Sequence, residues 1–153
     1  MMERIGEFLP FMLEGSVTTV QVFVITLVLS LPLGLPLALG SNSRFKPLSF
    51  LCKIYIWIFR GTPLMLQLWF FYFFFPFYFD ITLDAFTTAI VTYVLNYAAY
   101  FAEIYRGGIN SIDKGQYEAA YALGLSNRQT LFDIILPQTM KATLPPIVNE
   151  AIT

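Results

Sequence analysis

The long apolar runs decide what this chain can fold into. Residues 17–39 carry no charged side chain, and residues 85–105 carry one, Glu103. As α-helices these runs would be about 34 Å and about 31 Å long, enough to cross the ~30 Å hydrocarbon core of a bilayer. Because 57% of all residues are apolar and only 12% are charged, the composition is typical of a membrane protein. We therefore predict an all-α, polytopic transmembrane helix bundle.

One domain over residues 1–153 is expected to hold four apolar spans. We place these spans at about residues 16–40, 54–79, 85–105 and 138–153, with a cytoplasmic loop over residues 107–136. Pro32 and Pro36 should bend the first span, and Gly61-Thr62-Pro63 should break the second one. The fourth stretch would be only about 24 Å long. We therefore expect an incomplete fourth span and a chain truncated at its C-terminus.

The positive charges predict the orientation in the membrane. Of the 9 lysines and arginines, only Arg4 precedes the first span, whereas all others lie between the first two spans, near the start of the second, or after the third. Loops rich in Lys and Arg face the cytoplasm. We therefore expect a multi-pass protein of the cell (inner) membrane with an extracytoplasmic N-terminus. No cleaved signal peptide is expected, because no cationic segment precedes the first apolar run.

The segment from Glu118 to Gly124 differs from these apolar runs. It is rich in good helix formers, and Gly124 permits the left-handed backbone that ends a helix. Ser126 can cap a second short helix over residues 127–132. We therefore predict a compact projection of two short helices joined at a glycine. The alternative is an ordinary amphipathic helix–turn–helix without a special role.

The spacing of this segment resembles the Glu-Ala-Ala signature of the membrane subunits of ATP-binding-cassette importers. The matching residues are Glu118, Ala119, Ala120, Gly124, Ile134, Leu136 and Pro137, and Gly115 lies in a flanking motif that is assigned to the same coupling role. The sequences Arg60-Gly61-Thr62-Pro63 and 102–109 are similar to those of permeases for polar amino acids. The resemblance covers about residues 15–153, and it implies a type I-like importer permease fold with a coupling helix in the cytoplasmic loop.

The resemblance also implies partners. The loop would dock onto a separate cytoplasmic ATPase that binds ATP and Mg²⁺, so this chain would bind no cofactor itself. A second permease subunit, identical or different, and an extracytoplasmic solute-binding protein would complete the importer of a polar amino acid. The sequence contains no Gly-x-x-x-x-Gly-Lys-[Ser/Thr] phosphate-binding loop. The chain is therefore not expected to be an enzyme.

Polar side chains near the bilayer midplane are costly and are candidates for a solute path. By position in the spans, these candidates are Gln67, Asn96, Asn149 and Glu150. Glu150 could accept a solute ammonium group, and the amides could bind a solute carboxylate. Alternatively, Asn96 and Gln67 only join neighbouring helices. We expect Glu103 to pair with Arg106, and the break at Arg60-Gly61-Thr62-Pro63 to serve as a gate.

The remaining residue types exclude other classes of function. The chain has no histidine and a single cysteine, Cys52, so neither a metal site, a disulfide nor a catalytic residue is expected. A net charge of −1 argues against nucleic acid as a partner. The sequence favours the membrane subunit of an ATP-driven importer of polar amino acids. The alternatives are a permease for another small solute and a membrane fragment that does not transport.

Overall fold

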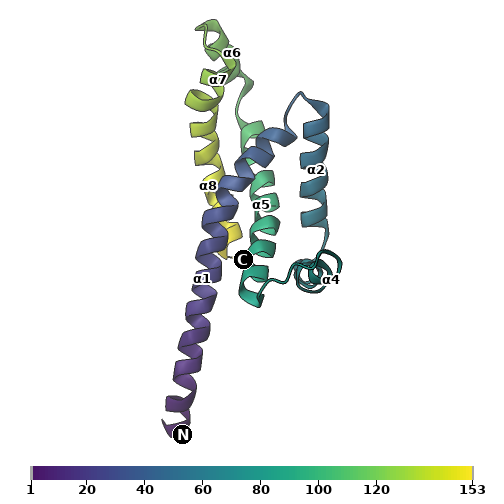
Figure 1. Cartoon of the computed structure of the whole chain (residues 1–153). Helices are drawn as coiled ribbons and strands as arrows, with labels where there is room; N and C mark the ends of the chain where they lie inside the picture. The colour runs from purple at the N-terminus through teal and green to yellow at the C-terminus, as the bar shows by residue number, and fades with distance from the viewer. Residues whose placement is uncertain (1, 153) are drawn as a thin grey trace.

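The computed structural model describes residues 2–152, and their side chains from Phe8 onward, so the predicted role of Arg4 lies outside the described side chains. All regular elements in this part of the chain are helices, as predicted. The first, α1 (Met2–Ser41), has 40 residues and begins well before the expected first span. Residues 8–13 within this extension are all apolar. Figure 1 shows its C-terminal part, which contains Pro32 and Pro36, turned toward α2.

The second apolar run forms two helical arms that are far from collinear. The first arm, α2 (Lys46–Gly61), starts earlier than expected and packs against α1 and α5. The second arm consists of α3 (Leu64–Trp69), the π-helical turn η1 (Phe70–Phe74) and α4 (Phe75–Phe79). The two arms are bent by 105°. The break expected at Gly61-Thr62-Pro63 is confirmed, and the bend there is large.

The central helix is α5 (Ala85–Ser111), which packs against α1, α2 and α8 (Leu136–Ile152). Its first turn is capped by Asp84, because a carboxylate oxygen of Asp84 accepts the Thr87 N–H at 3.1 Å. This hydrogen bond and that from the Thr87 hydroxyl hold the pKa of Asp84 below its ordinary value. At its other end, α5 continues six residues beyond the expected limit of the span.

Small residues on α5 allow its neighbours to approach closely. Ala98, Ala99 and Ala102 are all 0–1% exposed. At Gly34 of α1, an added Cβ atom would lie 2.8 Å from the Cβ of Phe101. Contacts this short are not tolerated, so the crossing of α1 and α5 requires glycine at this position.

After α5 the chain forms α6 (Lys114–Ala122), then α7 (Asn127–Gln129), the π-helical turn η2 (Thr130–Ile135) and α8. The last three elements follow one another without a loop. The expected second short helix over residues 127–132 is therefore not separate: it is the first part of one helix that reaches Ile152. Pro137 does not interrupt this helix, because proline is tolerated where the preceding π-helical turn has already altered the hydrogen-bond pattern.

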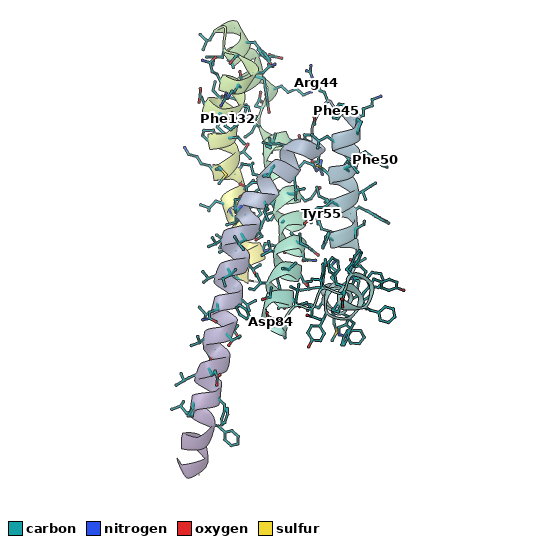
Figure 2. The ribbon with its side chains drawn as sticks, viewed as in Figure 1. Arg44, Phe45, Phe50, Tyr55, Asp84 and Phe132 are labelled. Carbon is teal, nitrogen blue, oxygen red and sulfur yellow. The ribbon has the colours of Figure 1, made fainter. Side chains whose placement is uncertain are left out.

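Large apolar side chains cover much of the outer surface. Phe11, Trp57 and Phe77 are 74%, 76% and 82% exposed, respectively. Figure 2 shows aromatic side chains projecting outward around the α4 segment, away from the bundle. A water-exposed surface of this kind would be unfavourable. The outer surface of the bundle is therefore suited to contact lipid or other apolar chains.

Candidate functional site

The bend between α2 and α3 follows from its local sequence. A residue that precedes proline is driven out of the helical region, and Thr62 is extended, with φ −116° and ψ 141°. Pro63 has φ −60° and is followed directly by α3. Because proline has no N–H, it can stand at the start of a helix without losing a hydrogen bond. The chain therefore changes direction within two residues.

Two buried amides hold this bend in place. Gln67 is 8% exposed and Asn96 is 5% exposed. The Gln67 amide nitrogen donates to the carbonyl of Phe59 at 2.9 Å and to Thr62 Oγ1 at 2.7 Å, while its oxygen accepts from Asn96 Nδ2 at 3.0 Å. Asn96 also donates to the Phe59 carbonyl, at 3.0 Å. The donors of Asn96 thus bind within the chain and link α5 to both arms, which leaves its Oδ1 as the group available to a solute.

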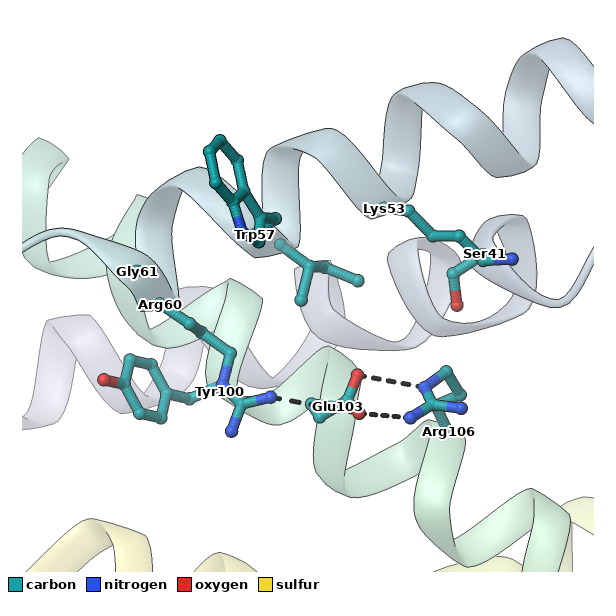
Figure 3. A pocket seen from close by; sticks show the side chains of 9 residues that line it. Ser41, Lys53, Trp57, Arg60, Gly61, Tyr100, Glu103 and Arg106 are labelled. Atoms are coloured by element: carbon teal, nitrogen blue, oxygen red, sulfur yellow. Dashed lines mark hydrogen bonds and ion pairs between the residues drawn. The ribbon is translucent and has the colours of Figure 1, made fainter.

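A cluster of charges joins α2 to α5 beside the bend. Figure 3 shows Glu103 between Arg60 and Arg106. Arg106 binds both carboxylate oxygens of Glu103, with Nε 2.9 Å from Oε2, so the expected pairing is confirmed. Arg60 Nη1 is 3.9 Å from Oε1, and its guanidinium carbon lies 5.2 Å from the ring centre of Tyr100. Since the Arg60 side chain is 40% exposed, its pairing with Glu103 is weak and Arg60 can bind a second anion.

Arg60 also lines two open cavities. A cavity of about 610 Å³ lies between α2 and α5 and contains the charge cluster. A cavity of about 550 Å³ at the bend is lined by Arg60, Asn96, Tyr97, Tyr100 and Glu150, together with residues 61–64. A guanidinium group and a carboxylate therefore border the same space. Together they can bind the carboxylate and the ammonium group of a zwitterion.

The predicted path residues are only partly brought together. Glu150 and Asn96 line the cavity at the bend, whereas Gln67 lines a mainly apolar cavity of about 430 Å³ on the other side of α3. Asn149 is exposed on α8. The sequence interpretation missed Tyr97 and Tyr100, which line the cavity at the bend. Their spacing of three residues on the helix that carries Asn96 could have indicated a shared face.

The second candidate site is the predicted projection, here called the coupling projection (residues 113–136). Gly124 has φ +75°, and Leu125 N–H donates to the Ala120 carbonyl at 3.0 Å, while Gly124 N–H donates to the Tyr121 carbonyl at 3.0 Å. This pair of hydrogen bonds is a Schellman motif, in which the left-handed residue is usually glycine. The predicted helix end at Gly124 is confirmed.

Side-chain hydrogen bonds fix the coupling projection on both sides of this turn. The Ser126 hydroxyl accepts the Gln129 N–H at 3.3 Å, and Gln129 Oε1 accepts the Ser126 N–H at 3.0 Å, which forms a capping box. The Tyr121 hydroxyl donates to Asn127 Oδ1 at 2.9 Å and joins α6 to α7. The cap at Ser126 was predicted, whereas the Tyr121 contact has no signal in the local sequence.

The signature residues divide into exposed and buried groups. Glu118, Ala119 and Gly124 are exposed, as are Gly115 and Pro137. Ala120, Leu136 and the half-buried Ile134 instead face the rest of the chain. Gly115 N–H donates to the Asp113 side chain at 2.6 Å, which caps the start of α6. The coupling projection therefore has an apolar side that supports it and an open side that carries Glu118.

Similar proteins are known for almost the whole chain. Residues 30–153 match the family described as binding-protein-dependent transport system inner membrane component. The chain is 46% identical to the arginine transport system permease protein ArtQ of Bacillus subtilis, over 95% of this chain and 66% of that protein. It is 37% identical to the putative glutamine transport system permease protein GlnP of Rickettsia felis, over 99% of this chain and 71% of that protein.

A solved structure has a closely similar fold. The crystal structure of an amino acid ABC transporter with histidines matches with a TM-score of 0.88 and 34% sequence identity, over 97% of this chain and 69% of that one. The chain thus spans about two thirds of the length of the proteins that it matches, with shares of 66% to 71%.

Proposed function

Because the chain belongs to the family of binding-protein-dependent transport system inner membrane components, we propose that it is the membrane subunit of an ATP-driven importer of polar amino acids. The relatives named for arginine and glutamine transport support this substrate class. The observation that carries the proposal is the cavity at the bend, where Arg60 and Glu150 supply opposite charges beside the Asn96 amide.

The coupling projection is the proposed contact with a separate ATPase, which would hold ATP and Mg²⁺. Its geometry supports this role. α6 follows α5 after the short turn at residues 112–113, and α7 runs into α8 without a loop. Gln138 Nε2 donates to Gln116 Oε1 at 3.1 Å and ties the base of the projection together. A displacement of the projection would therefore move α5 and α8, whose contact with each other lies beside the cavity.

The proposed orientation places the coupling projection in the cytoplasm and the start of α1 outside. The α1–α2 turn lies at the same end of the bundle as the projection (Figure 1), in agreement with the charge distribution. A second permease subunit and an extracytoplasmic solute-binding protein are the further proposed partners. In the full-length protein with Cys52 replaced by serine, a cysteine at Ser126 should resist a membrane-impermeant maleimide in intact cells, whereas a cysteine at Glu14 should react. Reversed labelling would contradict the orientation.

At the cavity, we assign the solute ammonium to Glu150 and the solute carboxylate to Arg60 and the helix-break segment. Asn96 Oδ1 can accept a further N–H of the ammonium group. Gln67 orients Asn96 through the 3.0 Å hydrogen bond between their side chains. Asn149 neighbours Glu150 on α8 and is assigned to the rim of the path. Gly61 and Pro63 allow the bend that brings these groups together.

The test is Glu150→Gln in the full-length protein assembled with its partners. The change keeps the side-chain size and removes the charge, so the variant should insert normally and retain basal ATPase activity. Its affinity for a cationic amino acid should fall about thirtyfold or more, because about 2–4 kcal/mol is lost with a partly buried charge pair. Glu14→Gln removes an exposed glutamate far from the cavity and serves as the matched control. Uptake of neutral, acidic and basic amino acids would be compared, and an unchanged selectivity profile would remove Glu150 from the site.

A further inference from the structure

One face of α2 carries cationic and aromatic side chains in alternation. They are Lys46, Phe50, Lys53, Trp57 and Arg60, here called the α2 stripe. At 100° per residue, the intervals of three and four residues keep all five within a sector of about 80°. All five residues are exposed, and Trp57 is exposed to 76%. The α2 stripe is therefore an open face, in contrast to the side of α2 that carries the buried Cys52 and Ile56.

Open cavities follow one another along the α2 stripe. A cavity of about 410 Å³ near the α1–α2 turn is lined by Lys46, Phe50 and Lys53, among others. Lys53 also lines the 610 Å³ cavity, together with Trp57 and Arg60, as Figure 3 shows. Arg60 in turn lines the cavity at the bend. Three neighbouring cavities with shared lining residues thus lie between the site at the bend and the α1–α2 turn.

This space has an excess of positive charge. Arg106 of α5 adds a fourth cation to the three of the α2 stripe. Glu103 is the only carboxylate among the residues that line the two cavities beside α2, and it is already bound by Arg106. Among the described residues, neither Lys46 nor Lys53 has a carboxylate within ion-pair distance. The field in this space therefore favours an anionic group.

The depth of these cations excludes lipid contact along the α2 stripe. Measured along the helix, Lys53 lies about 10 Å and Arg60 about 21 Å from Lys46. A cation at the end of a helix can extend to the headgroups, but charged side chains deeper in a span face a partner or water. Leu51 and Ile58, at 64% and 44% exposure, lie more than 100° away from the centre of the α2 stripe. α2 therefore separates an apolar environment from a polar one.

We propose that the α2 stripe lines a water-filled, cytoplasmic half of the solute path, and that its cations attract the carboxylate of a departing solute. The nature of the solute rests on the proposed transport function, whereas the water-filled face rests on the geometry of α2 alone. Arg60 stands where the site at the bend joins this half-channel. Its weak contact with Glu103 allows it to bind a carboxylate from either side.

The test uses thiol accessibility in the full-length protein with Cys52 replaced by serine. Single cysteines replace Trp57 on the α2 stripe and, as controls, Leu51 on the apolar face and Ser43 in the α1–α2 turn. Inside-out membrane vesicles are treated with an anionic methanethiosulfonate, which carries a sulfonate, or with a cationic one, which carries a trimethylammonium group. Rates are normalised to the reaction of each reagent with a small free thiol.

The cysteine that replaces Trp57 should react as fast as the one that replaces Ser43. The cysteine that replaces Leu51 should react at least about tenfold more slowly, because the reactive thiolate forms only in water. At position 57 the normalised rate of the anionic reagent should exceed that of the cationic reagent by about tenfold, and Lys53→Gln should reduce this preference. A cysteine at position 57 that is as unreactive as the one at Leu51, or a preference for the cationic reagent, would overturn the proposal. The labelling requires no transport, so a failure of amino acid uptake with this labelling pattern would count against the proposed solute alone.

Discussion

Replacement of Gly124 by valine should uncouple ATP hydrolysis from uptake while the protein still folds in the membrane. Gly124 has φ +75°, and an added Cβ atom would meet nothing within 4 Å. The penalty is therefore conformational and not a steric clash with neighbours. A left-handed backbone costs a residue with a side chain about 1–2 kcal/mol, and more when it is β-branched.

If the backbone leaves the left-handed region, the Schellman hydrogen bonds of Gly124 and Leu125 are lost. At about 1 kcal/mol each, their loss would cost about 2 kcal/mol, so the turn is destabilised by about 2 kcal/mol whether the backbone stays in the left-handed region or leaves it. In the turn itself Leu123 is 79% exposed, and the hydrogen bond from Tyr121 to Asn127 is then left to join α6 to α7. We therefore expect α6 to change its angle to α7, and the coupling projection to fit its ATPase poorly.

The assay measures ATP hydrolysis and amino acid uptake on the same proteoliposomes containing the full-length transporter. Two controls isolate the backbone effect. Gly124→Asn should retain most of the coupling, because asparagine tolerates a positive φ. Gly107→Val makes the same change at an exposed glycine within α5 where a Cβ atom meets nothing within 4 Å, so it should leave the uptake per ATP unchanged. Wild-type coupling in Gly124→Val at equal membrane abundance would refute the reasoning.

Two further predictions concern α1 and α5. Gly34→Ala should lower the stability to thermal unfolding in detergent by about 1–3 kcal/mol, because its Cβ would lie 2.8 Å from Phe101 Cβ. Gly15→Ala, where an added Cβ meets nothing within 4 Å, should not change the stability. Equal stability of the two variants would contradict the close crossing of α1 and α5. The pKa of Asp84 is lowered by hydrogen bonds from Thr87. The Asp84 cap therefore stabilises α5 fully above the ordinary pKa of a free aspartate, and this stabilisation is lost as the pH falls through the lowered pKa. The protection of amides at the start of α5 against hydrogen exchange, relative to an unstructured peptide at the same pH, should therefore fall below about pH 4. Asp84→Asn should remove this pH dependence, and the same acid response in both proteins would refute the prediction.

Features encoded in consecutive residues could be predicted from the sequence. The break at Thr62-Pro63, the left-handed Gly124 and the cap at Ser126 each depend on the conformational preference of one or two residues. The apolar runs likewise specified the helices of the bundle, because helix length and polarity are local quantities. These are the parts of the fold in which prediction and structure agree.

Features that depend on distant residues could not be predicted in this way. The bend is held by a hydrogen bond between Gln67 and Asn96, which are 29 residues apart. The sequence identified both amides as intramembrane polar groups but did not indicate that they bind each other. Similarly, Tyr97 and Tyr100 face the cavity only because α2 and α8 pack on the sides of α5 where these residues lie.

The π-helical turn η2 has a geometric consequence for the helix that contains α7 and α8. A π-helical insertion adds one residue without breaking the helix, and one residue corresponds to a rotation of about 100° about the axis. Side chains after Thr130–Ile135 therefore point about 100° away from the direction that they would have in an uninterrupted α-helix. Within this π-helical turn, Phe132 is 53% exposed, whereas Ile135, three residues later, is completely buried. Rotation of the end that carries α7 would thus reach α5 in a different direction from the one in which it was applied.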